Sequence, residues 1–144
     1  MGATIVLLGV DATRGLWIGH VWRKDYYPGT AACLDRAVGA MGATRGIGLY
    51  WEARKYTMLS KTHVLEIAQV SEDLSPYLWI NNDRDYDDPF RFVVVPDRSK
   101  DADVLVKNLG DRWGPPAAEK RCAKIRVLFW SKPFEIGNRG TSNG

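Results

Sequence analysis

The sequence predicts a single α+β domain whose strands form a mixed or antiparallel sheet curled into a small barrel. Three observations favour this class. The 144 residues are few for two domains, hydrophobic residues make up 45% of them, and short strand-like segments outnumber helical ones. The segments also lack the strand–helix alternation of doubly wound folds. We therefore expect one domain over residues 1–136 and a loose, small and polar tail over residues 137–144.

The first third of the chain contains two strand-like segments and then the clearest helix. TIVLLGV (4–10) and LWIGHVWR (16–23) are rich in aromatic and β-branched residues, and a polar break separates them. Apolar residues then recur at helical spacing over 31–41. Thr30 stands where an N-cap belongs, and Gly42 follows as a stop signal. This pattern predicts an early helix.

Short strand-like segments dominate the rest of the chain. A weaker helix is expected within 99–110, ended by Gly110, and NNDRDYDDP (81–89) is typical of a polar loop. The remaining segments are short, rich in strand-forming residues and bounded by turn residues. The expected strands lie at 45–54, 62–70, 76–80, 90–95 and 123–130.

GATRGIG (42–48) is similar to the glycine-rich turn of nicotinamide-dependent dehydrogenases. That turn needs a strand before it and a helix after it, so that a pyrophosphate meets the N–H groups of the helix. Here the best helix precedes Gly42, and the residues that follow alternate as in a strand. The chain is also too short for the usual dehydrogenase fold. We therefore reject a nicotinamide cofactor and expect none.

Charge and cysteine usage narrow the class of protein further. The formal net charge of +3 permits a nucleic-acid partner without requiring one. Cys33 and Cys122 stand alone, and we interpret them as buried free thiols, with one disulfide as the alternative. Two distant cysteines and two distant histidines predict no metal site.

The first residues lack a basic leader, and their apolar run is too short to span a bilayer. We expect a soluble, cytoplasmic protein with no membrane partner.

RGIGLYWEARKYTMLSKTHVLEIAQVSED (45–73) resembles the central hairpin of PUA-like domains, including the EVE and ASCH branches. In that family a strand ends in an aromatic pair, a polar excursion follows, and a second strand has alternating hydrophobic residues. LYW and VLEIAQVSED match this shape, while Arg45-Gly46 replaces the usual Gly-Asp. The resemblance implies a small barrel whose cleft recognises RNA or DNA, often by holding one base in an aromatic pocket.

The same resemblance carries Tyr50 and Trp51 over as the aromatic pair of such a cleft. If 45–54 is a strand, Trp51 shares a face with Ile47 and is the more buried of the two rings, and Tyr50 is the more exposed. Aromatic faces stack on bases, and basic side chains neutralise phosphates, so residue type adds further candidates. These are Trp17, Trp22, Trp79, Arg14, Arg45, Arg54 and Lys55.

We therefore favour a non-catalytic nucleic-acid-binding module with an aromatic, basic cleft, and two other classes stay open. His20 and His63 could act as the acid and base of a small nuclease or other hydrolase, because imidazole titrates near neutral pH. Glu66 is a weaker candidate, since it lies three residues after His63 and points to the opposite face of a strand. The other class is a protein-interaction or inhibitor module whose exposed aromatic residues anchor an interface.

Overall fold

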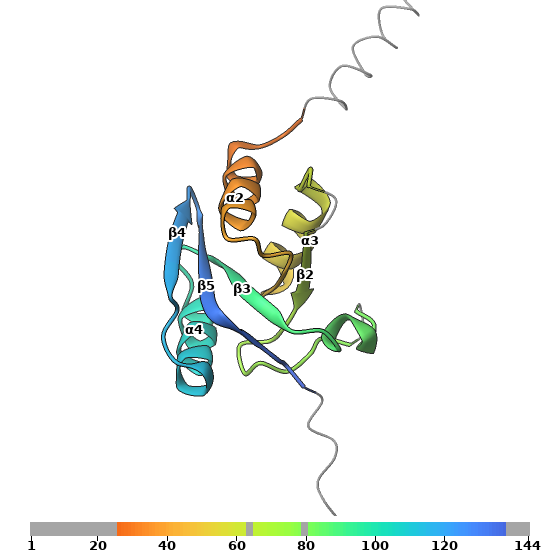
Figure 1. The fold of residues 1–144 in the computed structure, drawn as a ribbon, viewed down its shortest axis with the longest axis vertical. Coiled ribbons are helices and arrows are strands. Elements are labelled where there is room, and N and C mark those ends of the chain that lie inside the picture. The colour runs from red at the N-terminus through yellow and green to blue at the C-terminus, as the bar shows by residue number, and fades with distance from the viewer. Residues whose placement is uncertain (1–25, 63–64, 79–80, 138–144) are drawn as a thin grey trace, which may run out of the picture.

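A five-stranded mixed sheet forms the centre of the computed structural model, which describes residues 26–62, 65–78 and 81–137 (Figure 1). The strand order is β2-β1-β3-β5-β4. The three strands at one side are mutually parallel, and β5 and β4 continue the sheet in antiparallel pairs. The strands are β1 (Arg45–Gly48), β2 (Glu66–Gln69), β3 (Phe90–Pro96), β4 (Ala118–Cys122) and β5 (Ile125–Phe134).

The α+β class is confirmed, but the described sheet is open and does not close into a barrel. Its two edge strands, β2 and β4, lie at opposite ends of the strand order. A barrel closes only when its two outermost strands pair with each other, and β2 and β4 do not pair. The barrel expected from the sequence is therefore not what the described residues form.

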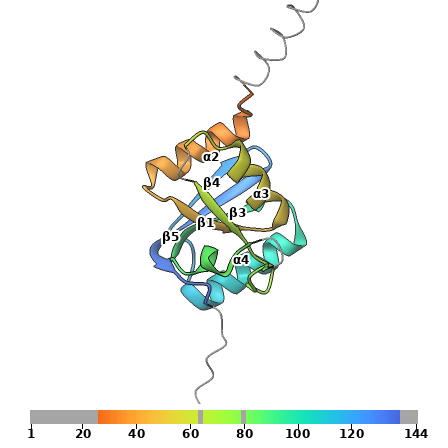
Figure 2. The same cartoon turned by 90° about the vertical axis from the view of Figure 1, so that its right-hand side faces the viewer.

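Helices cover both faces of the sheet (Figure 2). On one face, α2 (Gly29–Ala40) and α3 (Tyr50–Leu59) pack against one hydrophobic cluster. On the other, α4 (Lys100–Trp113) packs against a second cluster. A short 3-10 helix, η1 (Asp83–Tyr86), lies in the loop before β3. Residues 92–95 of β3 alternate between the two clusters and are fully buried, which is typical of a central strand.

Several predicted elements are confirmed, with changed bounds. The helix over 31–41 is α2, and the strand at 90–95 is β3. The predicted strand at 123–130 is β5, and the one at 62–70 contains β2. The weaker helix is α4, which does not end at Gly110 but continues to a left-handed Gly114. The predicted strands at 4–10 and 16–23 lie outside the described residues.

The prediction for residues 45–54 is wrong beyond residue 48. β1 ends there, and residues 50–59 form α3. Consequently β1 and β2 are parallel and joined by a helix, so 45–73 is not a hairpin. The predicted strand at 76–80 is also wrong: its described residues form only one isolated bridge, between Val70 and Pro76. The strand β4 was not predicted.

Cys33 and Cys122 form a disulfide, so their interpretation as free thiols is wrong. The bond joins α2 to the end of β4, across 89 positions of sequence. The Cys33 Sγ lies 3.9 Å from the carbonyl oxygen of Arg121. A disulfide sulfur carries no hydrogen to donate, so we treat this approach as packing. Disulfides persist mainly in oxidising compartments, and the cytoplasmic location stays a prediction.

Within the described ranges, none of the helices combines the length and the apolar character that crossing a bilayer requires.

Candidate ligand-binding crevice

A crevice of about 450 Å³ opens at the carboxyl ends of the three parallel strands. Leu49 follows β1, Gln69 ends β2 and Pro96 ends β3, and all three residues line it. The chain leaves β1 through α3 on one face of the sheet and leaves β3 through α4 on the other. Ligands of open sheets with parallel strands bind where the connections diverge in this way.

Two aromatic side chains project at the first turn of α3. Tyr50 and Trp51 stack edge to face, with ring centroids 4.8 Å apart. Trp51 is 73% exposed and Tyr50 is 38% exposed, so the expectation that Trp51 is the more buried ring is wrong. It rested on strand alternation, whereas a helix turns residue 51 outward. Tyr77 adds a third ring from the segment after β2.

Two glycines of the GATRGIG motif allow β1 to pack closely beside its neighbours and to lead directly into α3. A Cβ at Gly46 would lie only 2.2 Å from the ring of Phe92, and one at Gly48 would lie 3.0 Å from the carbonyl oxygen of Val94. Both glycines belong to β1, and the connection to α3 is the single residue Leu49. The motif therefore contains β1 and lies between α2 and α3, and its glycines serve close packing between strands and helix.

The hydroxyl of Tyr86 fixes the part of the crevice lining that contains Gln69 and Tyr77. It donates to the carbonyl oxygen of Gln69, and it accepts from the N–H of Tyr77 at 3.2 Å and from Asn81 Nδ2 at 2.9 Å. Burial raises the pKa of Tyr86, so the phenol stays protonated near neutral pH. These bonds fix the end of β2 relative to Tyr77.

Gln69 is the buried polar residue of the crevice. Its side chain is on the α3 side of the sheet, beside Gly48, and the residue is only 2% exposed. The Oε1 atom is buried and accepts no hydrogen bond. An acceptor left without a partner in a protein interior costs about 1–3 kcal/mol, so such groups are unusual. Gln69 lines the crevice, so a turn of its amide toward the hollow would let a ligand donor reach this atom.

The crevice is acidic. Its three charged lining residues are Glu52, Glu72 and Asp101, and the described lining contains no basic side chain. Glu52 and Asp101 lie in the first turns of α3 and α4, where the helix dipole favours a carboxylate. Burial raises the pKa of Glu52, while its own backbone N–H and Lys55 act in the opposite direction.

The predicted basic residues lie elsewhere. Arg45 and Arg54 line a neighbouring cavity of about 250 Å³ between α3 and the outer edge of β2. Arg45 forms an ion pair with Glu66, donates to the carbonyl oxygen of Asp85 at 2.8 Å, and lies over the ring of Phe90. The structure therefore makes one hollow that is aromatic and acidic, and the described residues do not assemble the aromatic, basic cleft expected from the sequence.

Lys55 is exposed on α3, and its ammonium lies 5.5 Å from the ring of Tyr56. Glu66, the weaker catalytic candidate, forms an ion pair with Arg45. In the described part of the chain, no three metal-binding side chains converge on one point. The other candidates, Arg14, Trp17, His20, Trp22, His63 and Trp79, lie outside the described residues.

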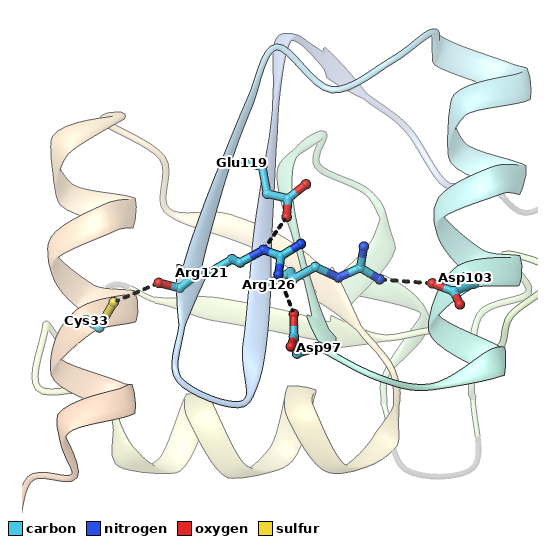
Figure 3. A network of polar contacts seen from close by, with 6 residues as sticks. All are labelled: Cys33, Asp97, Asp103, Glu119, Arg121 and Arg126. Atoms are coloured by element: carbon cyan, nitrogen blue, oxygen red, sulfur yellow. Dashed lines mark hydrogen bonds and ion pairs between the residues drawn. The ribbon is translucent and has the colours of Figure 1, made fainter.

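A second group of arginines is neutralised on the α4 side of the sheet (Figure 3). Arg121 and Arg126 oppose each other across the β4–β5 pair, where like charges repel. Arg121 contacts Asp97 at 3.6 Å and Glu119 at 3.4 Å, and Arg126 contacts Asp103 at 3.0 Å. This face consequently carries mixed charge and is not a basic patch.

Sequence reasoning missed Gln69, Tyr77 and the carboxylates of the crevice. One signal was present: Gln69 interrupts the apolar run of LEIAQV near its end. A polar residue at the carboxyl end of a buried strand is where binding residues of parallel sheets occur. The signal became useful only after β1 and β2 were known to be parallel.

No protein-family model, curated protein or solved structure matches the chain.

Proposed function

We propose that this protein binds an exposed base of single-stranded RNA or DNA in the crevice. The observation that carries the proposal is the meeting of exposed aromatic rings and a buried amide with an unused acceptor in one hollow at the carboxyl ends of three parallel strands. Aromatic rings stack on bases, and buried amides recognise base edges.

The size of the crevice suits one base. A hollow of about 450 Å³ falls in the range of small-molecule sites. Stacking on an aromatic side chain contributes about 1–3 kcal/mol per base. Trp51 offers most of its ring surface to such a ligand. The base is therefore the part of the strand that the crevice holds.

The phosphates of the strand stay outside the crevice, because its carboxylates repel them. Basic side chains lie one helical turn away: Arg54 is four residues after Tyr50, and Lys55 is four residues after Trp51. A strand running along α3 meets these two side chains. With about two phosphates contacted, the affinity should fall only shallowly with salt, with a logarithmic slope near −1.4 for a single strand.

Substitution of Trp51 tests the proposal. Short RNA and DNA strands with a fluorescent end label are titrated with protein, and anisotropy is followed at about 50 and about 200 mM salt. We expect Trp51→Ala to weaken binding by about 5- to 150-fold, because one stacking contact is lost. Tyr26→Ala is the matched control, since Tyr26 is 66% exposed and lies outside the crevice. Equal affinity of the two variants, or no binding by the unaltered protein, contradicts the proposal.

A second candidate function is protein recognition through α3. Trp51 and Met58 are 73% and 83% exposed on this helix, and exposed tryptophan and methionine are enriched at interfaces. This candidate predicts tight binding to one protein, lost in both Trp51→Ala and Met58→Ala, with no affinity for oligonucleotides. The hydrolase alternative and the PUA-like resemblance stay predictions.

A further inference from the structure

We infer that the crevice selects bases that carry an exocyclic amino group and discriminates against bases that lack one. The inference rests on the proposed function, because it concerns the same crevice, and it names the class of base that the crevice accepts.

The balance of hydrogen-bonding groups in the crevice carries this inference. Glu52, Glu72 and Asp101 supply only acceptor oxygens when ionised, and Gln69 Oε1 is a buried acceptor without a partner. Lysine and arginine, the strong side-chain donors, do not occur in the described lining. A ligand edge that donates N–H groups matches these side-chain acceptors, and the amide N–H groups of Gln69 and the first-turn N–H groups of α3 and α4 can still serve an acceptor elsewhere on the ligand.

The serine hydroxyls do not reverse the balance. The hydroxyl of Ser71 donates to the carbonyl oxygen of Ser75 at 3.3 Å. The oxygen of Ser99 caps α4 by accepting from the N–H of Ala102 at 3.4 Å. The hydroxyls of Tyr50 and Tyr77 can donate or accept, so they accommodate either kind of edge.

Base chemistry then predicts the order of preference. Adenine, cytosine and guanine carry an amino group with two N–H donors, which uracil and thymine lack; uracil has a carbonyl oxygen where cytosine has its amino group. A carbonyl oxygen facing a carboxylate is repelled, and it leaves Gln69 Oε1 unsatisfied. Sites built for hydrogen bonding reject an analogue that lacks the group, because buried polar atoms remain unpaired.

Guanine and hypoxanthine provide the sharpest comparison, because hypoxanthine is guanine without its amino group. The probes are abasic sugar-phosphate strands that carry one central base: guanine, hypoxanthine, cytosine or uracil. All probes have the same phosphates, so differences in affinity report the base alone. We expect guanine to bind at least about fivefold more tightly than hypoxanthine, and cytosine at least about fivefold more tightly than uracil.

Variants of the acceptors test whether the crevice causes this preference. Gln69→Met removes the buried acceptor at similar volume, and Glu52→Gln replaces a carboxylate with an amide. In each variant the ratio of the affinity for guanine to the affinity for hypoxanthine should fall toward one. Glu135→Gln makes the same chemical change on an exposed residue outside the crevice and should keep the preference. Because Gln69 is buried, urea unfolding of each variant checks its folding, and the half-buried Glu52 supplies an independent variant.

The outcomes separate the two proposals. If none of the single-base probes and no ordinary strand binds, the proposed function is wrong and the inference falls with it. If strands bind and Trp51→Ala weakens them, but guanine equals hypoxanthine, the inference is overturned while the proposed function stands. Tighter binding of uracil than of cytosine also overturns the inference.

Discussion

The buried carboxylate of Asp35, on α2, joins this helix to the end of α3 and to the segment before α2. Asp35 is 7% exposed. Its oxygens accept hydrogen bonds from the hydroxyl of Tyr27, from the hydroxyl of Ser60 at 2.7 Å and from the N–H of Lys61 at 2.9 Å. Ser60 is the C-cap of α3, so this carboxylate anchors the end of that helix to α2. Such bonds offset the cost of burying a charge.

We expect Asp35→Asn to lower the free energy of unfolding by about 1–3 kcal/mol, because the amide presents N–H groups where donors already point. Urea unfolding followed by circular dichroism measures the change. Asp87→Asn, a substitution at an exposed position, should stay within about 0.5 kcal/mol of the unaltered protein. Equal stability of the two variants would contradict the role given to Asp35.

Tyr27 provides a second readout of the same site. Burial, together with the hydrogen bond and the negative charge of Asp35, raises the pKa of Tyr27 to about 12 from an ordinary 10.0. A raised pKa in the folded state favours folding below pH 10, and that contribution is lost as the pH rises toward 12. In Asp35→Asn the pKa of Tyr27 should move back toward its ordinary value, as measured by ultraviolet titration against Tyr27→Phe.

At the scale of elements, β1 and α3 form one unit whose geometry depends on missing side chains. Gly46 lies under the ring of Phe92 on the neighbouring strand, and Gly48 lies beside the first turn of α3. Close packing between the strand and the helix brings Tyr50 and Trp51 to the edge of the crevice. The position of the aromatic pair is therefore set by glycines that do not touch a ligand.

We expect Gly46→Ala to destabilise the protein by about 1–3 kcal/mol, because its Cβ would overlap the ring of Phe92. The double variant Gly46→Ala with Phe92→Leu should be less destabilised than the sum of the two single variants, since a smaller side chain makes room. Thermal or urea unfolding of the four proteins gives the coupling. Additive effects of the two substitutions would show that no such contact exists.

At the scale of the whole molecule, the disulfide is a covalent link between helix α2 and the sheet. Cys33 lies on α2, and Cys122 ends the edge strand β4. Its loop includes β1, α3, β2, β3 and α4, which together surround the crevice. The bond restricts the unfolded chain strongly because the loop is long.

Reduction should lower the free energy of unfolding by about 2–4 kcal/mol. Urea unfolding with and without a reductant measures this difference. The double variant Cys33→Ser and Cys122→Ser should match the reduced protein and should not respond to the reductant. Two free thiols in the unreduced, denatured protein would contradict the disulfide.

The sequence alone determined the elements whose signals are local. Helical spacing of apolar residues identified α2, apolar residues on one face identified α4, and apolar β-branched runs identified β3 and β5. It also singled out Tyr50 and Trp51 as candidate binding residues, from a resemblance that placed them at the end of a strand. Residue type and short-range pattern are sufficient for such inferences, because neighbours in sequence decide them.

Only the tertiary structure decided what those residues form together. Residues 45–54 have both strand and helix character, and packing of Gly48 against α3 resolves the ambiguity in favour of a short strand and a helix. Parallel pairing then brings Gln69, Glu72 and Asp101 to the aromatic pair and its neighbour Glu52, and it leaves Arg45 in another hollow. Contacts between segments distant in sequence leave no periodic signal in the chain. The acidic character of the crevice therefore became visible only when the strands were placed side by side.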